Sequence, residues 1–367
     1  MAEKAIRLGG ESTADAIVSA VDAMYTEHTF AEKDFALKHN DDEISVDTNF
    51  AAQNFWKEAL IRFFNKKSAV LGLVLIVVIV LLAVFGPGMN SYTYSGQDLS
   101  QKNFAPRVPG IEQFGILDGS EKMSTTTGTK VTNAYQEKDK PDVYYWFGSD
   151  LYGRDIWTRT WEGARVSLII AVAAAIIDML IGMSYGLISG YFGGRVDMVM
   201  QRFLEVANGI PRLVIVTLLL LVLQPGMVTI IFALMLTEWV GMSRIARAEM
   251  LKLKDQEFVL ASRTLGAGSF FIIFKEVLPN IIGPIITQVM FSIPTAIFTE
   301  AFLSFVGLGI PVPQCSLGSL ISELYNSFTT HPYQIIPPIV VMSLLMLSFN
   351  LVADGLREAL DPKMKSM

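Results

Sequence analysis

The chain has 367 residues, of which 51% are apolar and only 17% are charged, and its mean hydropathy is +0.43. Soluble domains carry about 25% charged residues, and apolar runs of about 20 residues recur here, so the composition points away from a soluble domain and indicates a multi-span helical membrane protein. The formal net charge of −6 averages over two aqueous sides, and the single cysteine, Cys315, excludes an intramolecular disulfide and an all-cysteine metal site.

The first 67 residues are predicted to form a cytoplasmic tail that ends in an interfacial helix. Residues 1–60 are acidic and mostly polar. Apolar residues at helical spacing between Ser12 and Met24 fit either a short amphipathic helix or a partly ordered tail. The segment 55–67 alternates aromatic and basic residues, so Trp56, Phe63 and Phe64 can lie in the membrane interface while the cations stay in water.

Six apolar segments are predicted to cross the bilayer. The first covers 68–88. The polar stretch 89–164 has no run long enough to span and is predicted to be an extramembrane loop or a small folded insert. The other five spans belong to a core domain, 165–354, and residues 355–367 form a C-terminal tail. The expected bounds of these five spans are 166–191, 204–223, 227–242, 281–298 and 335–352.

The distribution of Lys and Arg predicts the orientation of the chain. Cations precede the first span, lie between the second and third and between the fourth and fifth, and follow the sixth, whereas the third-to-fourth turn and residues 307–333 have none. The positive-inside rule therefore places both termini and the loop 244–280 in the cytoplasm, and the 89–164 insert outside the cell. The cations of the insert do not weaken this prediction, because loops longer than about 60 residues are largely exempt.

The loop 244–280 is polar and basic, although strongly apolar segments flank it. Residues 257–265 are predicted to form a helix, which Gly266 ends because glycine tolerates the left-handed conformation of a tight C-cap. Pro279 is predicted to open the next segment. A short helix held between two spans is suited to docking with something outside the membrane. The cations of the loop are Arg244, Arg247, Lys252, Lys254, Arg263 and Lys275.

Three acidic residues and one arginine fall in or at the ends of the predicted spans. Asp178 is the deepest of them. It is either a substrate-path or proton-relay carboxylate, or one that is paired at a helix interface with a partner subunit or lies nearer the surface, and the second interpretation is favoured. Glu238, near a span end, is expected to have an interfacial structural role, and Glu300 is a pathway or packing candidate. Arg212 is expected to extend to the cytoplasmic surface.

Glycines form a stripe along the second span. Gly182, Gly186 and Gly190 recur every four residues, so they share one helix face. Small residues at this spacing let two membrane helices approach closely. The sequence therefore predicts a packing face here, opposite the third span, the fifth span or a second subunit.

No motif of an enzyme or of a bound cofactor occurs in the sequence. The patterns GxxxxGK[ST], GxSxG, HExxH and CxxC are missing, and the three histidines have no metal-ligand spacing. We therefore predict no catalytic residues, no cofactor or metal bound by this chain, and no nucleic-acid partner. An ion-coupled secondary transporter that uses Asp178 is the main alternative class, and a channel or membrane scaffold is a weaker third option.

The 244–280 loop resembles the cytoplasmic loop of permease subunits of bacterial ABC importers. That loop has the form EAA, three residues, Gly, nine residues, I-x-L-P. Leu260-Ala261-Ser262 stand at EAA, Gly266 stands at the glycine, and Leu278-Pro279 stand at the end of the pattern. Leu260 replaces the expected acid, and Glu257 lies three positions earlier.

Further sequence blocks indicate which group of these permeases the chain resembles. Residues 147–168 look like G-T-D-x-x-G-R-D…G-A-R-x-S-L, and residues 197–211 are similar to D-x-x-x-x-R…P. Residues 300–309 resemble E-A-x-L-S-F-L-G-L-G, and residues 354–362 resemble D-G-L-R-D-x-L-D-P. From Phe55 onwards the chain is similar to the C-type permease of oligopeptide and dipeptide importers.

The resemblance implies an all-α type I importer permease with six transmembrane helices in the bacterial cytoplasmic membrane. A second homologous permease subunit, two cytoplasmic ATPase subunits that bind ATP and Mg²⁺, and an extracellular peptide-binding protein would complete the importer. The substrate could be an oligopeptide, a dipeptide, nickel or a signalling peptide, and the insert could dock the binding protein, gate the outer mouth or be passive. The implied ATPase-coupling residues are Glu257, Leu260, Ala261, Ser262, Arg263, Gly266, Leu278 and Pro279.

Overall fold

The computed structural model describes residues 55–125 and 128–360, and the structural statements below concern these residues. The amphipathic helix expected between Ser12 and Met24, and the last residues of the C-terminal tail, 361–367, lie outside them.

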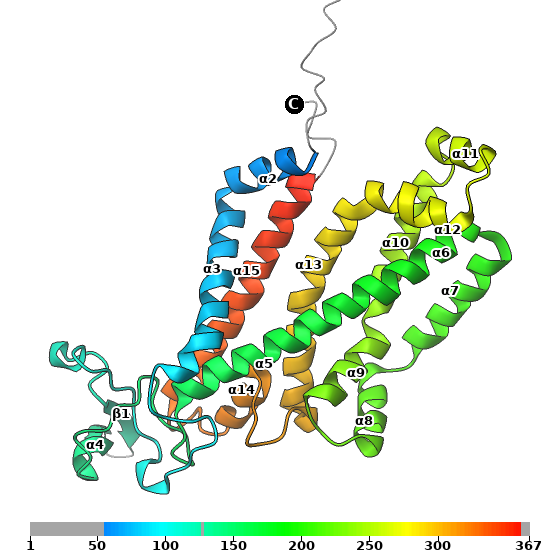
Figure 1. The fold of residues 1–367 in the computed structure, drawn as a ribbon. Helices are drawn as coiled ribbons and strands as arrows, with labels where there is room; N and C mark the ends of the chain where they lie inside the picture. Colours follow the sequence, from blue (N-terminus) through cyan, green and yellow to red (C-terminus); the bar gives the residue numbers. More distant parts are fainter. Residues whose placement is uncertain (1–54, 126–127, 361–367) are drawn as a thin grey trace, which may run out of the picture. The chain divides into compact units, whose positions relative to one another are not determined.

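Long apolar helices make up most of the fold (Figure 1). Five are long and apolar enough to cross a membrane, and a sixth span results if the bent pair α7 and α8 is counted as one. The five are α3 (Lys67–Phe85) with the turn η3 (Gly86–Gly88); α5 (Ile156–Ile177) with the π-helical η6 (Asp178–Met183) and α6 (Ser184–Phe192); α9 (Met227–Thr237) with α10 (Trp239–Leu253); α12 (Ser269–Phe271) with the π-helical η7 (Ile272–Val277), α13 (Leu278–Leu303) and η8 (Ser304–Leu308); and η9 (Pro332–Gln334) with α15 (Ile336–Leu360).

The second span begins before the expected boundary at residue 165. Helix α5 starts at Ile156, because the Asp155 side chain caps it by accepting a hydrogen bond from the Thr158 amide at 2.8 Å. Its first turns are polar but buried, in part against α14 (Leu317–Tyr325). Residues 156–164 therefore belong to the span rather than to the insert. Hydropathy misplaced the boundary because these polar side chains are covered by protein and not by lipid.

The fourth, fifth and sixth spans also extend past their predicted ends. Helix α10 continues beyond residue 242 to Leu253, and the fifth span starts at Ser269 rather than at residue 281. These extensions bury Ala246, Met250 and Ile273 in one apolar cluster, which sustains the helices where overall hydropathy falls. In the sixth span α15 runs to Leu360, beyond the expected residue 352. The loop between the fourth and fifth spans is therefore much shorter than 244–280.

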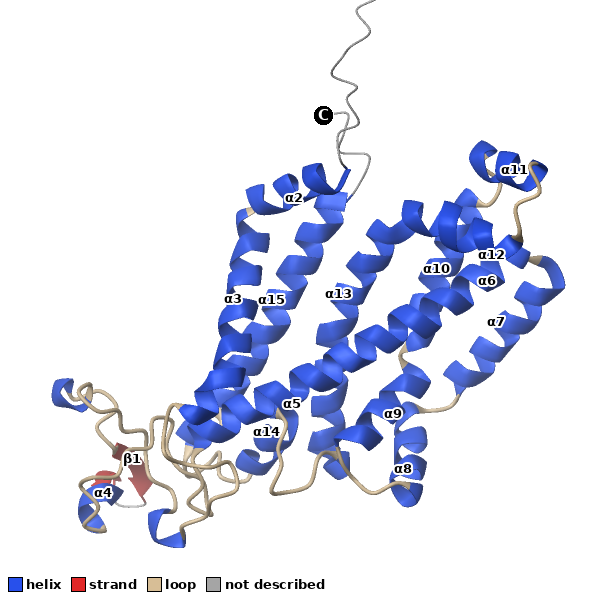
Figure 2. Ribbon diagram, viewed as in Figure 1, coloured by secondary structure: helices blue, strands red, loops and turns tan. Residues whose placement is uncertain are grey.

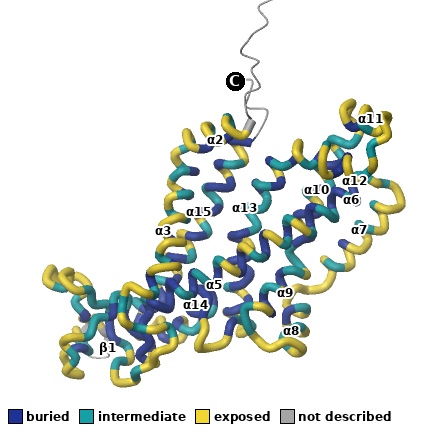
Figure 3. Tube along the Cα trace, viewed as in Figure 1, coloured by how far each residue is buried: buried dark blue, intermediate teal, exposed yellow. Residues whose placement is uncertain are grey.

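The third span is not one helix. Helices α7 (Gly194–Gly209) and α8 (Arg212–Val222) are bent by 77° at the break between them. Ile210 is extended, as expected for a residue that precedes a proline, and Pro211 follows it. Leu204 is the one buried residue of α7, and most of this helix is exposed (Figure 3). The third span therefore stays a prediction, and the segment 204–223 is a bent helix pair rather than one continuous helix.

The insert between the first two spans contains the two strands of the described structure, so the all-α prediction is wrong in this detail (Figure 2). Strands β1 (Ser120–Thr125) and β2 (Gly128–Asn133) pair antiparallel, with Ser120 opposite Asn133. Phe104, Tyr135 and Tyr145 form the aromatic core of the insert. The strands were not predicted because their polar sequences lack a period-two apolar pattern. The other short elements of the insert are η4 (Leu99–Gln101), η5 (Glu112–Phe114) and α4 (Ala134–Glu137).

The helix expected at the membrane interface is α2 (Phe55–Asn65), which packs against α15. Trp56 and Phe64 are exposed, but Phe63 is buried against Ala69, Val352 and Ala359, because it fills a gap between α3 and α15. The expectation of an interfacial Phe63 is therefore wrong. Within the described residues, α2, the short helix α11 (Glu257–Thr264) and the last turn of α15 lie toward one end, and the insert and α14 lie toward the other (Figure 1).

Candidate functional site

Helix α11 begins at the predicted residue, ends one residue before the predicted end, and has the C-terminal cap that the sequence predicts. It covers Glu257–Thr264, and Gly266 follows with a φ of 86°. The Gly266 amide donates to the Arg263 carbonyl and the Ala267 amide donates to the Ser262 carbonyl, both at 3.0 Å. This pair of bonds is a Schellman motif, which needs a left-handed residue and therefore favours glycine. The prediction that Gly266 ends this helix is confirmed.

Few side chains hold α11 on the rest of the chain. Val259 is fully buried and belongs to the apolar cluster that includes Met250 and Ile273. The Arg263 guanidinium lies 5.5 Å from the centre of the Tyr191 ring, a cation–π contact to α6. Most other side chains of α11 and its cap are exposed, and Ser262 has intermediate exposure. The exposed residues of α11 and its cap are Glu257, Phe258, Leu260, Ala261, Arg263, Thr264, Leu265 and Gly266.

Leu278 and Pro279 lie inside a continuous helix that begins at Ser269, so the prediction that Pro279 opens the next segment is wrong. They follow the π-helical η7 and form the first turn of α13. Proline lacks the amide that would donate to the preceding turn of a continuous helix, and the irregular hydrogen bonding of η7 directly before it accommodates this loss. Their role in ATPase coupling stays a prediction.

The glycine stripe of the second span packs against α10. A Cβ atom on Gly182 would lie 2.6 Å from the Trp239 carbonyl oxygen, and one on Gly190 would lie 2.9 Å from the Met250 Cβ. A Cβ on Gly186 would overlap the Ser243 carbonyl. The partner is thus the fourth span, because α10 extends past residue 242, and not the third span, the fifth span or a second subunit.

A bidentate ion pair joins α7 to the same helix. The Arg247 Nε and Nη2 atoms donate to the two oxygens of Asp197, each at 2.6 Å. The Ser189 hydroxyl of α6 also donates to Asp197, at 2.6 Å. These contacts link α6, α7 and α10 near α11. Sequence reasoning placed Asp197 only in a resemblance block and gave Arg247 no partner.

Asp178 lies inside the helix bundle, at the start of the π-helical η6. The residue is 4% exposed, so it does not sit near the surface, and its Oδ1 atom has no hydrogen-bond partner among the described residues. Ser292 of α13 interacts with it, and Glu238 and Arg212 act on it through their charges. π-Helical turns often mark functional positions. A direct role in the pathway stays a prediction.

Arg212 and Glu238 form an ion pair at the break of the third span. Arg212 Nη1 lies 2.6 Å from Glu238 Oε1 and donates to the Thr299 hydroxyl of α13 at 3.2 Å. The expectation that Arg212 extends to the cytoplasmic surface is therefore wrong, because α8 begins at the break and presents this side chain to α9 and α13. Glu238 lies near the middle of the span Met227–Leu253 and not at its end, because α10 continues that span.

Glu300 has a packing role. Its side chain is buried, and it accepts hydrogen bonds from the hydroxyls of Ser304 at 2.7 Å, Ser316 at 2.5 Å and Ser167 at 3.2 Å. Ser167 belongs to α5, and Ser316 caps the N-terminus of α14. Glu300 therefore joins the second span, the fifth span and α14.

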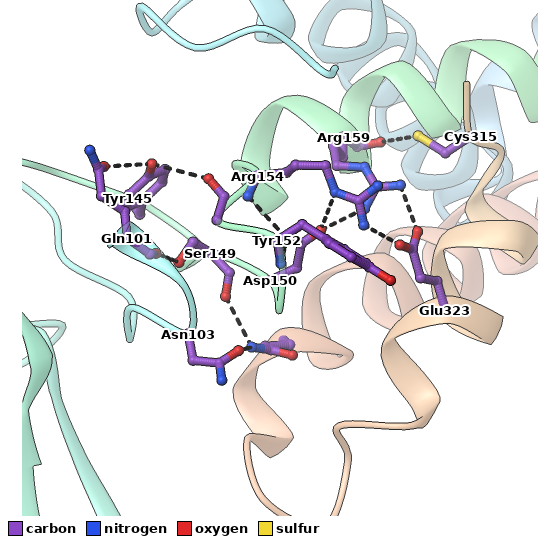
Figure 4. Close-up of polar contacts among 12 residues, drawn as sticks. Gln101, Asn103, Tyr145, Ser149, Asp150, Tyr152, Arg154, Arg159, Cys315 and Glu323 are labelled. Carbon is purple, nitrogen blue, oxygen red and sulfur yellow. Dashed lines mark hydrogen bonds and ion pairs between the residues drawn. The ribbon is translucent and has the colours of Figure 1, made fainter. Parts of the chain in front are cut away.

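A buried ionic network joins the insert to α14 (Figure 4). Asp150 Oδ2 accepts from Arg154 Nε at 2.7 Å and from Arg159 Nη1 at 2.8 Å. Arg159 Nη2 donates to Glu323 Oε2 at 2.7 Å, and Arg154 also pairs with Glu323. Arg159 is fully buried, and the Cys315 thiol contacts its carbonyl. The network fixes the turn before α5 against the helix that precedes α15.

The sequence analysis missed this network, although the block 147–168 contains three of its four members. The alternation of Asp and Arg in that block was a usable signal for pairing. The sequence around Glu323 held no such signal, because Glu323 is a single acid far away in the chain, and only the fold brings it close to Arg154 and Arg159. Among residues 55–125 and 128–360, no group of three His, Cys, Asp or Glu side chains gathers as metal ligands would.

Comparison with known proteins assigns the family. Residues 182–366 match the binding-protein-dependent transport system inner membrane component, and residues 54–106 match the N-terminal TM domain of oligopeptide transport permease C. The chain is 41% identical to the oligopeptide transport system permease protein OppC of Bacillus subtilis, over 85% of this chain and 91% of that protein. It is 42% identical to the dipeptide transport system permease protein DppC of Lactococcus lactis, over 85% and 92%.

Among solved structures, the chain is similar to the MetNI methionine ABC transporter in an inward-facing conformation. The identity is 16% and the TM-score is 0.48, over 55% of this chain and 96% of that chain. The family assignment rests on the sequence relatives. They do not favour the ion-coupled secondary transporter that was the main alternative. The chain therefore belongs to the binding-protein-dependent transport system inner membrane components, as a multi-pass cell-membrane permease subunit of the oligopeptide and dipeptide ABC importer type.

Proposed function

We propose that this chain forms half of a translocation pathway for peptides, beside a second homologous permease subunit. An extracellular binding protein delivers the peptide, and two cytoplasmic ATPase subunits, which bind ATP and Mg²⁺, drive its passage. The curated relatives are permease proteins of peptide transport systems, which supports this assignment. ATP hydrolysis belongs to the partners, so the chain itself is not an enzyme.

The proposed coupling element is α11. Apolar side chains at its exposed surface can insert into a groove on an ATPase subunit; Leu260 is 44% exposed and Leu265 is 87% exposed. Val259 and the Arg263–Tyr191 contact can transmit movement of α11 to α10, α6 and the start of the fifth span. The capped, partly exposed helix at the end of two spans is the observation that carries this function.

The proposed orientation places α11, α2 and the end of α15 in the cytoplasm and the insert outside the cell. The alternation of Lys and Arg along the sequence supports it. The fold agrees with that alternation, since α2, α11 and the last turn of α15 lie toward the same end (Figure 1). The insert at the other end is suited to dock the binding protein or to gate the outer mouth.

The substitutions Gly266→Pro and Gly266→Asp test the coupling role. Proline fixes φ near −65° and removes the amide that donates to Arg263, whereas Gly266 needs a φ of 86°; aspartate is strained at this φ. We expect normal membrane insertion and loss of peptide-stimulated ATP hydrolysis in the complete importer reconstituted in proteoliposomes. Normal stimulated hydrolysis in both variants would rule out α11 as the coupling element.

Gly268→Asp is the matched control. Gly268 has a φ of −70° and caps the N-terminus of α12, a position that accepts aspartate, and a Cβ there meets no atom within 4 Å. We expect hydrolysis in this variant to stay near that of the unmodified importer. A loss as large as that of Gly266→Asp would mean that added charge, and not the broken cap, causes the defect.

A further inference from the structure

The Arg212–Glu238 pair lies where a membrane protein rarely places ionisable groups. Glu238 is near the middle of a span, and Thr299, the third member, lies on the buried side of α13. Such groups usually face the interior of a bundle or a water-filled path, because contact with lipid is costly. An arginine that is 41% exposed at this depth therefore needs an aqueous or polar neighbour beyond the described residues.

The exposed side of this cluster presents hydrogen-bond donors. The Glu238 side chain is 12% exposed and Asp178 is 4% exposed, so the acids lie on the inner side. Both contacts of Arg212 use Nη1, which leaves Nε and Nη2 without a described partner. Pro211 gives α8 no side-chain cap, so the positive end of the helix dipole adds to the same surface. A carboxylate is the group that matches a guanidinium with free parallel donors.

We propose that Arg212, positioned by Glu238 and Thr299, binds a carboxylate of the peptide as it passes the break between α7 and α8. The carboxylate can be the C-terminus of the peptide or an acidic side chain. The broken third span resembles the discontinuous helices that other transporters use to present helix ends to anionic groups of a substrate. This inference rests on the proposed peptide transport and names a residue that would set specificity within it.

Arg212→Gln in the complete reconstituted importer tests this site. Trialanine and trialanine amide are each supplied on saturated binding protein, and initial uptake rates are measured. We expect about a tenfold loss of trialanine uptake, with uptake of the amide nearly unchanged, because a charge-assisted hydrogen bond is lost only for the acid. Arg195→Gln, an exposed arginine of α7 outside the cluster, is the matched control and should leave both rates unchanged.

A third peptide, the amide of Ala-Asp-Ala, separates the two sources of carboxylate. Uptake that depends on Arg212 identifies an acidic side chain as sufficient, and uptake that does not depend on it identifies the C-terminus. Equal loss of trialanine and its amide in Arg212→Gln would overturn the inference and make Arg212 a support of the break or a contact to the second permease. Unchanged uptake of trialanine would overturn it as well.

Glu238→Gln gives a second test that keeps the arginine. The glutamine amide oxygen can still accept from Arg212 Nη1 and so keep it in place, but it no longer neutralises the arginine, so the preference for trialanine over the amide should be kept or increased. A fall of that preference to one, with normal uptake of the amide, would also overturn the inference. If the unmodified importer moved none of these peptides, the proposed function itself would fail, which is a distinguishable result.

Discussion

The two ends of the helical bundle are built in opposite ways. At the insert end, charged side chains are buried and paired with one another, as in the network of Asp150, Arg159 and Glu323. At the α11 end, a short helix is held mainly by Val259 and the Arg263–Tyr191 contact, and its other apolar side chains stay exposed. The ionic network at the insert end is complete within the chain, whereas the exposed apolar side chains of α11 leave a surface for another chain.

The largest effect on stability is expected from removing a cation of the buried ionic network at the insert end. Arg159→Met leaves Asp150 and Glu323 without one of their cations in a buried site, so we expect a loss of about 3–5 kcal/mol in the free energy of unfolding. Thermal unfolding in detergent, followed by tryptophan fluorescence, measures this loss.

The control for this variant is Arg202→Met on α7. The Arg202 side chain is 76% exposed and pairs with Glu205, so removing its charge should change stability by less than about 1 kcal/mol. Similar losses in the two variants would contradict the difference between a buried network and an exposed pair.

A smaller effect is expected at the α11 end. There, a variant of buried Val259 should change the stability of the helix, and a variant of exposed Leu260 should change its coupling to the ATPase. Val259→Ala removes fully buried methyl groups and should lower the local stability of α11 by about 1–3 kcal/mol. Amide hydrogen exchange over residues 257–264 should then accelerate at least about fivefold.

Leu260→Ala is the counterpart of that variant, because Leu260 is exposed. Exchange in α11 should remain as in the unmodified protein, while peptide-stimulated ATP hydrolysis should fall at least about fivefold if this side chain enters the ATPase groove. Faster exchange without any change in hydrolysis would show that Leu260 supports α11 and does not contact a partner.

The smallest effect concerns pH at the insert end. Burial opposes the ionisation of Glu323, but the charges of Arg159 and Arg154 outweigh it and hold the pKa of Glu323 below its ordinary value of 4.5. Because the folded pKa is the lower one, the stabilisation is fully present above pH 4.5 and is lost as the pH falls through the folded pKa.

Glu323→Gln removes this titration. The drop in unfolding temperature between pH 6 and pH 3.5 should therefore be smaller in the variant than in the unmodified protein. An identical drop in both proteins would show that other carboxylates account for acid destabilisation of this end.

Short-range sequence patterns correctly predicted that most of the chain is helical and that Gly266 caps α11. Gly266 has the left-handed conformation that its place after a helical pattern suggested, and the glycine stripe does mark a close-packed face. The predicted span boundaries were wrong where side chains are buried against other parts of the protein instead of contacting lipid. Helix α5 begins in polar sequence at Ile156, and α10 continues to Leu253 through a basic stretch. Hydropathy indicates which residues can contact lipid, whereas the first turns of α5 and the last turns of α10 are covered by other parts of the chain.

The sequence by itself determined the membrane class, the approximate number of spans, the family blocks and the α11 helix, because these depend on residues that are neighbours in the chain. Only the tertiary structure decided the partner of the glycine stripe and the pairings of Arg212 and Glu323. Each of these depends on contacts between residues far apart in the sequence. Arg212 shows the difference most clearly, since its sequence position suggested water and the fold places it beside Glu238 and Thr299.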